Sequence, residues 1–196
     1  MTSSQTLGVG DIASNFTIPY CENGEGYFNL YDECNGAVNG GNYKVTWLTL
    51  FSSWWSDCQA EASVQEGIWQ DYVNSGAPVM MIDYGVDWGT YSCYRWADAF
   101  GTSYPILDGE ADESLIDIYS QGIAPHHVVI DHNMEIIYSE IGFDQDGIIN
   151  IINSALEYLP MDVDGDEINN IDDNCPHTYN PNQDDLDDDE VGDLID

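Results

Sequence analysis

The chain has 196 residues and carries 37 Asp and Glu residues against two Lys and Arg residues, a formal net charge of −35 at pH 7. This charge excludes nucleic acid as a partner, because binding there depends on neutralising phosphates, and it argues equally against an anionic membrane surface. No stretch approaches the ~18 apolar residues that span a bilayer, so we expect no membrane insertion. The length and the 43% hydrophobic content allow one domain with a real core, plus a small appendage.

Strands and helices are expected to alternate along residues 1–159. Residues 10–18 lead into a short strand, and the Gly-, Asn- and Cys-rich residues 21–42 are expected to form a decorated hairpin or loop. The β-prone run Val45–Phe51 predicts a strand buried on both faces. The remaining elements in chain order are a helix over 58–72, a strand over 78–84, helices over 91–100 and 114–119, a hairpin of strands 128–131 and 135–141, and a closing helix over 148–159. This order predicts an α/β fold with a central mixed sheet flanked by helices on both faces.

The tail from Pro160 onward holds 14 acidic residues and no Lys or Arg. Its acids recur in two frames that are 23 residues apart. Carboxylates at positions 1, 3, 5 and 12 of a loop, with a backbone carbonyl at position 7, are the oxygen ligands that Ca²⁺ requires. The sequence therefore predicts two calcium sites. Their ligands would be Asp162, Asp164, Asp166, Ile168 and Asp173 in the first frame, and Asp185, Asp187, Asp189, Val191 and Asp196 in the second.

The segment between the two frames carries the elements Asn-Cys-Pro at 174–176 and Asn-Pro-Asn-Gln at 180–183. With these elements the tail resembles the thrombospondin type 3 repeat. The resemblance implies a calcium-wrapped loop module over residues 160–196, with little regular structure and no conventional hydrophobic core. Glu167 and Glu190 stand where that family usually has Gly, and the cysteine that would pair with Cys175 is missing.

Two segments of residues 1–159 resemble thioredoxin-like redoxins of the exported, TlpA-like type. Residues 50–61 read Leu-Phe-Ser-Ser-Trp-Trp-Ser-Asp-Cys-Gln-Ala-Glu, close to the family pattern Phe-Trp-Ala-x-Trp-Cys-x-x-Cys-x-Ala-Glu at the junction of a strand and a helix. Residues 119–131 resemble the segment that carries the family's cis-proline, which would be Pro125. The resemblance implies a thioredoxin-like fold over about residues 8–159. Trp55 stands where the first, attacking cysteine would be, so only Cys58 remains of the pair.

The redox chemistry that this resemblance implies would depend on Cys58, Cys93 and Pro125. Asp57 and Glu61 are close to Cys58 in sequence and raise the pKa of its thiol, which disfavours a reactive thiolate. Some peroxiredoxins use a cysteine pair with the spacing of Cys58 and Cys93, but the Pro and Thr of their active-site motif are absent here. The substrate would be a thiol or disulfide protein, or a peroxide.

Two functions follow from these patterns. The leading hypothesis is an exported thioredoxin-like thiol-disulfide oxidoreductase or weak peroxidase with a calcium-binding repeat. The alternative is a redox-inactive thioredoxin-fold module that binds an extended peptide in the groove beside the cis-proline by backbone pairing. The sequence names no electron donor and no oligomeric state.

The other cysteines and two histidines suggest further features. Cys21 and Cys34 enclose a polar loop and are expected to pair as a structural disulfide. His126 and His127 alternate in a strand, so one should face the cis-proline site, either as a groove-lining residue or, with Cys58, as part of a copper or zinc site. Five cysteines and a calcium module indicate an extracellular or periplasmic location, and we expect an export signal that was trimmed or lies upstream of Met1.

Overall fold

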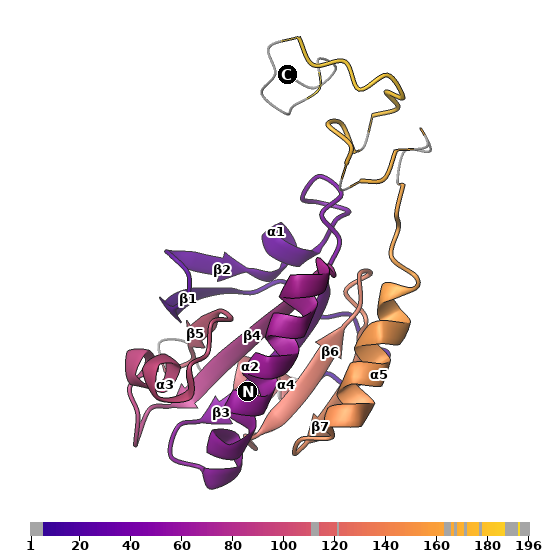
Figure 1. Ribbon diagram of the computed structural model, residues 1–196. Helices are drawn as coiled ribbons and strands as arrows, with labels where there is room; N and C mark the ends of the chain where they lie inside the picture. The colour runs from indigo at the N-terminus through magenta and orange to yellow at the C-terminus, as the bar shows by residue number, and fades with distance from the viewer. Residues whose placement is uncertain are drawn as a thin grey trace.

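The structure is a computed structural model that describes residues 6–110, 114–120, 122–162, 166, 168–170, 172–176, 178–186 and 192 (Figure 1). Its strands are β1 (Thr17–Glu22), β2 (Tyr27–Asn29), β3 (Val45–Ser52), β4 (Val79–Asp87), β5 (Ile106–Asp108), β6 (His126–Ile130) and β7 (Ile136–Ile141). Its helices are α1 (Leu30–Cys34), α2 (Ser56–Ser75), α3 (Cys93–Phe100), α4 (Ser114–Tyr119) and α5 (Gln145–Leu156). The strands form a seven-stranded sheet in the order β2-β1-β5-β4-β3-β6-β7.

Strand β3 is an interior strand of this sheet, between β4 and β6, and all eight of its residues are buried. It pairs in parallel with β4 and antiparallel with β6. β4 is parallel to β5, while β1 and β7 run antiparallel to their neighbours β5 and β6. The sheet is therefore mixed, and the α/β thioredoxin-like fold predicted from the sequence is confirmed.

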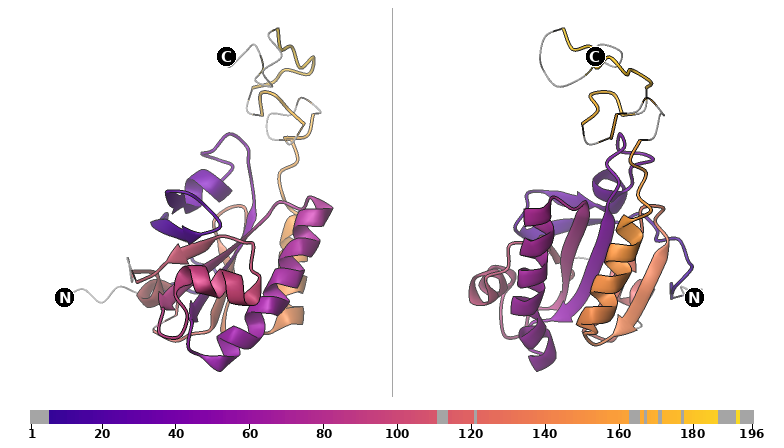
Figure 2. Two further views of the ribbon diagram at one scale, coloured as in Figure 1. Left: turned by 60° about the vertical axis from the view of Figure 1, so that its left-hand side comes forward. Right: turned by 45° about the vertical axis from the view of Figure 1, so that its right-hand side comes forward.

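Side chains that alternate along β3 fill two separate cores. Val45 and Trp47 pack against α2 and α5, which lie side by side on one face of the sheet (Figure 2). Leu48 and Leu50 point to the opposite face and pack with residues of α4, such as Leu115. This alternation explains why the sequence of β3 is apolar almost without a break.

Three elements differ from the sequence-based expectation. β5 was not expected, because three residues are too few to give a periodic pattern. The hairpin or loop expected over 21–42 is in part the antiparallel hairpin of β1 and β2, and the short helix α1 within it was not expected. Helix α5 begins earlier than expected, because the Asp144 side chain accepts a hydrogen bond from the backbone N–H of Gly147 (3.1 Å) and caps it.

The expected Cys21–Cys34 disulfide is wrong, since Cys21 pairs with Cys93 and their Cα atoms are 6.0 Å apart. Helix α3 lies against β1, which brings its first residue to the Cys21 side chain. Cys34 is instead buried with Leu30 in the core on the α4 face, where burial raises the pKa of its thiol to about 11. Cys34, Cys58 and Cys175 are free thiols, so the Cys58–Cys93 pair is not formed either.

The tail leaves the end of α5 and extends away from the sheet (Figure 1). In the described part of the tail no helix or strand is formed, and turns are held by side-chain hydrogen bonds. No helix among the described residues is long and apolar enough to cross a membrane.

The first prediction concerns the Cys21–Cys93 disulfide. Cys93→Ser should lower the free energy of unfolding by about 4 kcal/mol, because the bond joins residues 72 positions apart and restricts the unfolded chain. Urea unfolding with and without reductant measures this. Reductant should lower the stability of the wild type to that of the variant and leave the variant unchanged.

Counting thiols provides the control for that experiment. Alkylation of the denatured, unreduced protein should modify three cysteines, and alkylation after reduction should modify all five. Modification of Cys21 or Cys93 without reductant would contradict the pairing.

Candidate functional site

The site begins at the turn between β3 and α2, which Ser53 ties to the loop that follows β4. The Ser53 side chain is fully buried, and its hydroxyl oxygen accepts hydrogen bonds from the backbone N–H groups of Thr90 (3.2 Å) and Tyr91 (3.1 Å). Because these partners are 37 and 38 residues away, the bonds fix two distant loops side by side. The outer rim of the site is therefore rigidly placed.

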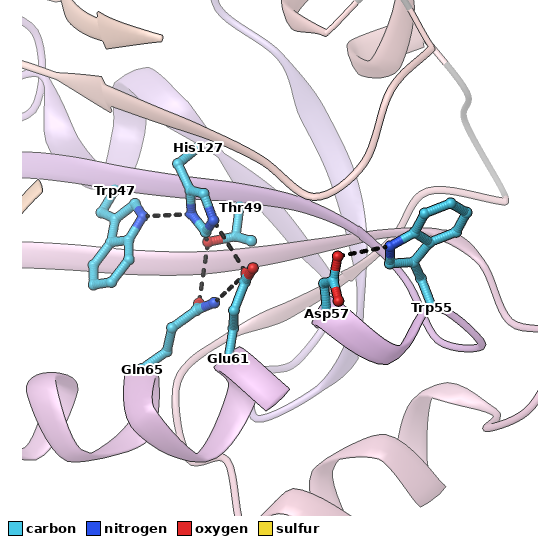
Figure 3. Close-up of polar contacts among 7 residues, drawn as sticks. All are labelled: Trp47, Thr49, Trp55, Asp57, Glu61, Gln65 and His127. Carbon is cyan, nitrogen blue, oxygen red and sulfur yellow. Dashed lines mark hydrogen bonds and ion pairs between the residues drawn. The ribbon is translucent and has the colours of Figure 1, made fainter. Parts of the chain in front are cut away.

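Two tryptophans project from this turn into solvent. Trp54 is 46% exposed and Trp55 is 42% exposed, and their ring centroids are 5.2 Å apart at an interplanar angle of 63°. The indole N–H of Trp54 donates to Asp87 Oδ2 (2.6 Å), and that of Trp55 donates to Asp57 Oδ2 (3.3 Å; Figure 3). Trp55 occupies the place at which the family resemblance implies the attacking cysteine.

Cys58, in the first turn of α2, is buried behind the tryptophans. Its side chain packs with Phe51, Ala62 and Trp96. Burial, with a smaller contribution from the nearby carboxyl groups of Glu61 and Asp83, raises the pKa of the thiol to about 12. A thiol with this pKa is almost entirely protonated at neutral pH, whereas the nucleophile in thiol chemistry is the thiolate.

The expected cis-proline is present, since the Ala124–Pro125 bond is cis. In the β3–β6 register Leu50 lies opposite His126, so continuing that register places Ala124 opposite Ser52, next to the turn that carries the tryptophans. Ala124 forms no backbone hydrogen bond with any described residue, and Ile123 before it is 46% exposed. The backbone groups of Ala124 are therefore available to pair with another backbone, whereas the Pro125 carbonyl accepts a hydrogen bond from the backbone N–H of Gly142 (3.0 Å).

Beneath the turn, a buried polar network joins β3, β6 and α2 (Figure 3). His127 Nε2 lies 3.2 Å from Glu61 Oε2, and Trp47 Nε1 donates to His127 Nδ1 (3.2 Å). The Thr49 hydroxyl donates to Gln65 Oε1 (3.2 Å), and Gln65 Nε2 donates to Glu61 Oε2 (3.5 Å). The network fastens the strand that follows the cis-proline to the helix that carries Cys58.

The donor-only indole of Trp47 decides the proton position on His127. Because an indole N–H can only donate, Nδ1 of His127 must accept, and the hydrogen sits on Nε2 and points at Glu61. Both ring nitrogens are therefore occupied, and neither is available to a metal. Among the described residues no group of three His, Cys, Asp or Glu side chains is arranged to hold a metal ion, which removes support for the copper or zinc site with Cys58.

His126 points to the other face of β6, where its Nε2 lies 2.9 Å from the Ser139 hydroxyl. Burial lowers the pKa of His126 to about 4, so its imidazole is neutral at pH 7. The two histidines alternate across the strand as predicted, but both are buried and neither lines an open groove.

Asp83, on β4, is a fully buried acid near Cys58. Burial raises the pKa of its carboxyl group to about 8. The hydroxyl of Tyr104 and the indole N–H of Trp96 act in the opposite direction, yet neither makes a well-formed hydrogen bond, and one Asp83 oxygen has no partner among the described residues. Burial outweighs these two groups, because an imperfectly paired carboxylate is costly to charge in the protein interior. Asp83 could have been noticed in the sequence as a polar residue within the apolar run of β4.

The predicted catalytic residues are thus separated by the structure. Cys58 is buried, Cys93 is held in the disulfide with Cys21, and only Pro125 lies at the edge of the turn. Three features of the site were not predicted from the sequence. They are the buried hydroxyl of Ser53, the Glu61–His127 contact and the solvent exposure of the two tryptophans. The adjacent pair Trp54-Trp55 between Ser53 and Ser56, in an otherwise polar junction, was the visible sign in the sequence of the exposed tryptophans.

The first predicted calcium frame lies partly within the described residues. Asp166 Oδ1 accepts from the backbone N–H of Ile168 (2.8 Å) and its Oδ2 from that of Asn180 (3.0 Å). Asp173 Oδ1 accepts from the backbone N–H of Cys175 (2.8 Å) and from Gln183 Nε2 (2.9 Å), while its buried Oδ2 has no partner among the described residues. Asp162 and Asp185 are also described; Asp164, Asp187, Asp189, Val191 and Asp196 lie outside the described residues.

Comparison with known proteins identifies the fold alone. The sequence matches no known protein-family model and no curated protein sequence. The structure is similar to a protein from Chlorobium tepidum assigned as the thiol:disulfide interchange protein DsbE, with a TM-score of 0.60 and 18% identity over 77% of this chain and 99% of that one. It is similar to a protein from Bacteroides thetaiotaomicron assigned as a protein disulfide isomerase, with a TM-score of 0.61 and 21% identity over 81% and 94% of the two chains. It is also similar to the reduced 2-Cys peroxiredoxin of Plasmodium vivax, with a TM-score of 0.58 and 18% identity over 76% and 82%.

The second prediction concerns the pH dependence that Asp83 confers. Its folded-state pKa of about 8 lies above its ordinary value of 3.8, so its contribution to stability is fully present below pH ~4 and is lost as the pH rises through 8. Asp83→Asn keeps a neutral side chain of similar shape. Between pH 5 and pH 8 the wild type should therefore lose on the order of 3 kcal/mol more stability than this variant.

Chemical unfolding at several pH values measures this difference. Asp98→Asn, an exposed substitution on α3 with the same change of charge, serves as the control and should follow the wild type. Parallel pH profiles for the wild type and Asp83→Asn would contradict the raised pKa.

Proposed function

We propose that residues 1–159 form a redox-inactive thioredoxin-fold module that binds an extended peptide along the Ala124–Pro125 edge, beside Trp54 and Trp55. The observation that carries this proposal is the exposed indole of Trp55, at the position where the sequence resemblance implies the attacking thiol, together with the burial of Cys58, the one thiol of the turn. Of the two functions derived from the sequence, this geometry favours the binding module over the oxidoreductase.

Binding would combine two contributions that the site can supply. The free backbone groups of Ala124 would pair with the peptide in the manner of an added strand, which gives affinity without demanding a particular sequence. The exposed faces of Trp54 and Trp55 and the exposed Ile123 would cover its side chains. The bonds from Ser53 to the loop after β4 hold this surface ready before the peptide arrives.

The third prediction tests the binding function with a resin-bound pool of ten-residue peptides, random in sequence but free of cysteine. The wild type should bind the pool, and Trp55→Ala should weaken binding about tenfold because it removes one of the two exposed aromatic faces. Tyr158→Ala is the matched control: Tyr158 is 74% exposed and follows α5, whose last turn lies at the opposite end of the domain from the start of α2 (Figure 1), so its removal should change nothing.

Redox assays in the same preparation distinguish the alternative function. With an aromatic disulfide or hydrogen peroxide as substrate, the wild type and Cys58→Ser should turn over equally slowly. Trp55→Cys, which supplies a second thiol at the family spacing, should gain disulfide-reducing activity, whereas Trp54→Cys, one residue away, should not. Turnover that depends on Cys58 in the wild type would favour the oxidoreductase instead.

We also propose that residues 160–196 bind Ca²⁺ through the two frames, in an oxidising compartment outside the cytosol. The buried Oδ2 of Asp173, which has no partner among the described residues, supports the first site, because a carboxylate oxygen buried without a partner is costly unless a cation or donor compensates it. The described hydrogen bonds around it come from Gln183 and Cys175, which belong to the elements that resemble the thrombospondin repeat. The Cys21–Cys93 disulfide supports the compartment.

The fourth prediction is that two calcium ions bind with dissociation constants of about 10⁻⁴ M, which is typical of extracellular modules. Calorimetry should give this value, and hydrogen exchange should show slower exchange in the tail with calcium than with chelator. Asp173→Asn should remove one of the two ions and leave exchange in residues 6–110 unchanged. A tail that exchanges equally fast in millimolar calcium would contradict the calcium proposal.

A further inference from the structure

The exposed tryptophan pair has no cation of its own chain beside it. The chain contains two Lys and Arg residues in all. Lys44 lies 3.9 Å from the carboxylate of Glu33, and Arg95 makes no ion pair or ring contact with any described residue. The faces of Trp54 and Trp55 are therefore open to a cation from another molecule.

The surroundings of the two indoles favour positive charge. Each indole N–H donates to a carboxylate, Trp54 to Asp87 and Trp55 to Asp57. A hydrogen bond from the ring N–H to an anion adds electron density to the ring, and the negative face of an indole is what attracts an ammonium or guanidinium group. The 63° angle between the rings makes a corner with two such faces.

The carboxylates at the rim of this corner keep acceptor capacity. Asp57 Oδ1 accepts from the Ser56 hydroxyl (3.4 Å), and Asp87 Oδ1 accepts from the backbone N–H of Gly89 (3.1 Å). Each carboxylate offers about four acceptor positions, so both can still receive an N–H from a cationic side chain. A Lys or Arg group could thus lie on an indole face and donate to a carboxylate at the same time.

The acidic rim continues into the loop after β4. Glu110 Oε1 accepts from the backbone N–H of Trp88 (2.7 Å), and Asp108 Oδ1 accepts from the Trp88 indole (3.1 Å). Gly89 joins this part of the rim to the tryptophan pair, because a Cβ atom there would lie 2.9 Å from Cδ1 of Trp54. The indole can lie against the loop since this residue has no side chain.

From these contacts we infer that the peptide bound by this module is basic, with a Lys or Arg side chain seated against Trp54 and Trp55 and between Asp57 and Asp87. The inference rests on the proposed peptide-binding function and names the chemistry of its ligand. Ser53 holds the loop after β4 beside the turn, and Trp88 in that loop donates to Asp108 and Glu110, so these two acids lie on the same side of the loop contacts as the tryptophan pair.

The net charge of −35 would attract any cationic peptide, so the test must separate the tryptophan corner from the charge of the whole molecule. Three resin-bound pools of ten-residue peptides serve as probes. They lack Cys, Lys, Arg, Asp and Glu except at the central position, which is Lys in one pool, Gln in the second and Glu in the third. Binding is measured at 150 mM NaCl, where long-range attraction is screened over about 8 Å.

The wild type should bind the Lys pool about tenfold more tightly than the Gln pool, and the Glu pool most weakly. Trp55→Leu keeps the net charge and most of the apolar area but removes the ring face, so the Lys preference should fall to about twofold. Tyr158→Leu, at the other end of the domain, should keep the full preference. Asp87→Asn should reduce the preference more than Glu157→Gln, which makes the same charge change after α5.

The results distinguish a failure of the basic-peptide inference from a failure of the peptide-binding function. If the wild type binds the Lys and Gln pools equally, or if Trp55→Leu retains the full Lys preference, the basic-peptide inference fails while peptide binding stands. If no pool is bound and the fully random pool is not bound either, the peptide-binding function itself fails.

Discussion

The burial of strand β3 on both faces is the constraint on which the rest of this molecule depends. β3 is paired along both edges and covered on both sides, so its backbone position is fixed. The position of Ser53, the next residue, is fixed with it. Ser53 then enters the protein interior and ties the loop after β4 to the turn. The outward direction of the two tryptophans and the inward direction of Cys58 are both determined within six residues of the end of this strand.

The same geometry disfavours thiolate chemistry at Cys58. A thiol at the start of a helix gains from the helix dipole only when it can ionise. Cys58 is placed instead among aromatic rings and beside two acids, which favours its protonated form. The side-chain N–H groups of Gln65 and His127 are directed at Glu61 and not at the sulfur, and the backbone groups of Ser52 and Cys58, which lower the pKa of the thiol, do not outweigh its burial. At the turn between β3 and α2 this protein exposes the two indoles of Trp54 and Trp55 and buries the thiol of Cys58.

The sequence was sufficient for the fold and for part of the site. Local patterns predicted the central elements of the fold. They are the apolar run of β3, the helical spacing after Cys58 and the segment around Pro125. The partner of Cys21 could not be predicted, since its neighbour Cys93 is brought close only by the packing of α3 against β1. The Glu61–His127 contact and the raised pKa of Asp83 likewise arise from tertiary burial, which no local spacing encodes.

The rarity of basic residues and the burial of β3 have a joint consequence for proteolysis. Enzymes that cleave after Lys or Arg have two bonds to attack in this chain, Lys44–Val45 and Arg95–Trp96. Val45 opens the buried strand β3 and Trp96 is a buried residue within α3, so neither bond can enter a protease cleft as an extended segment in the folded protein. Cleavage would require local unfolding of the sheet or of α3, and digestion by trypsin-like enzymes would report the stability of those elements.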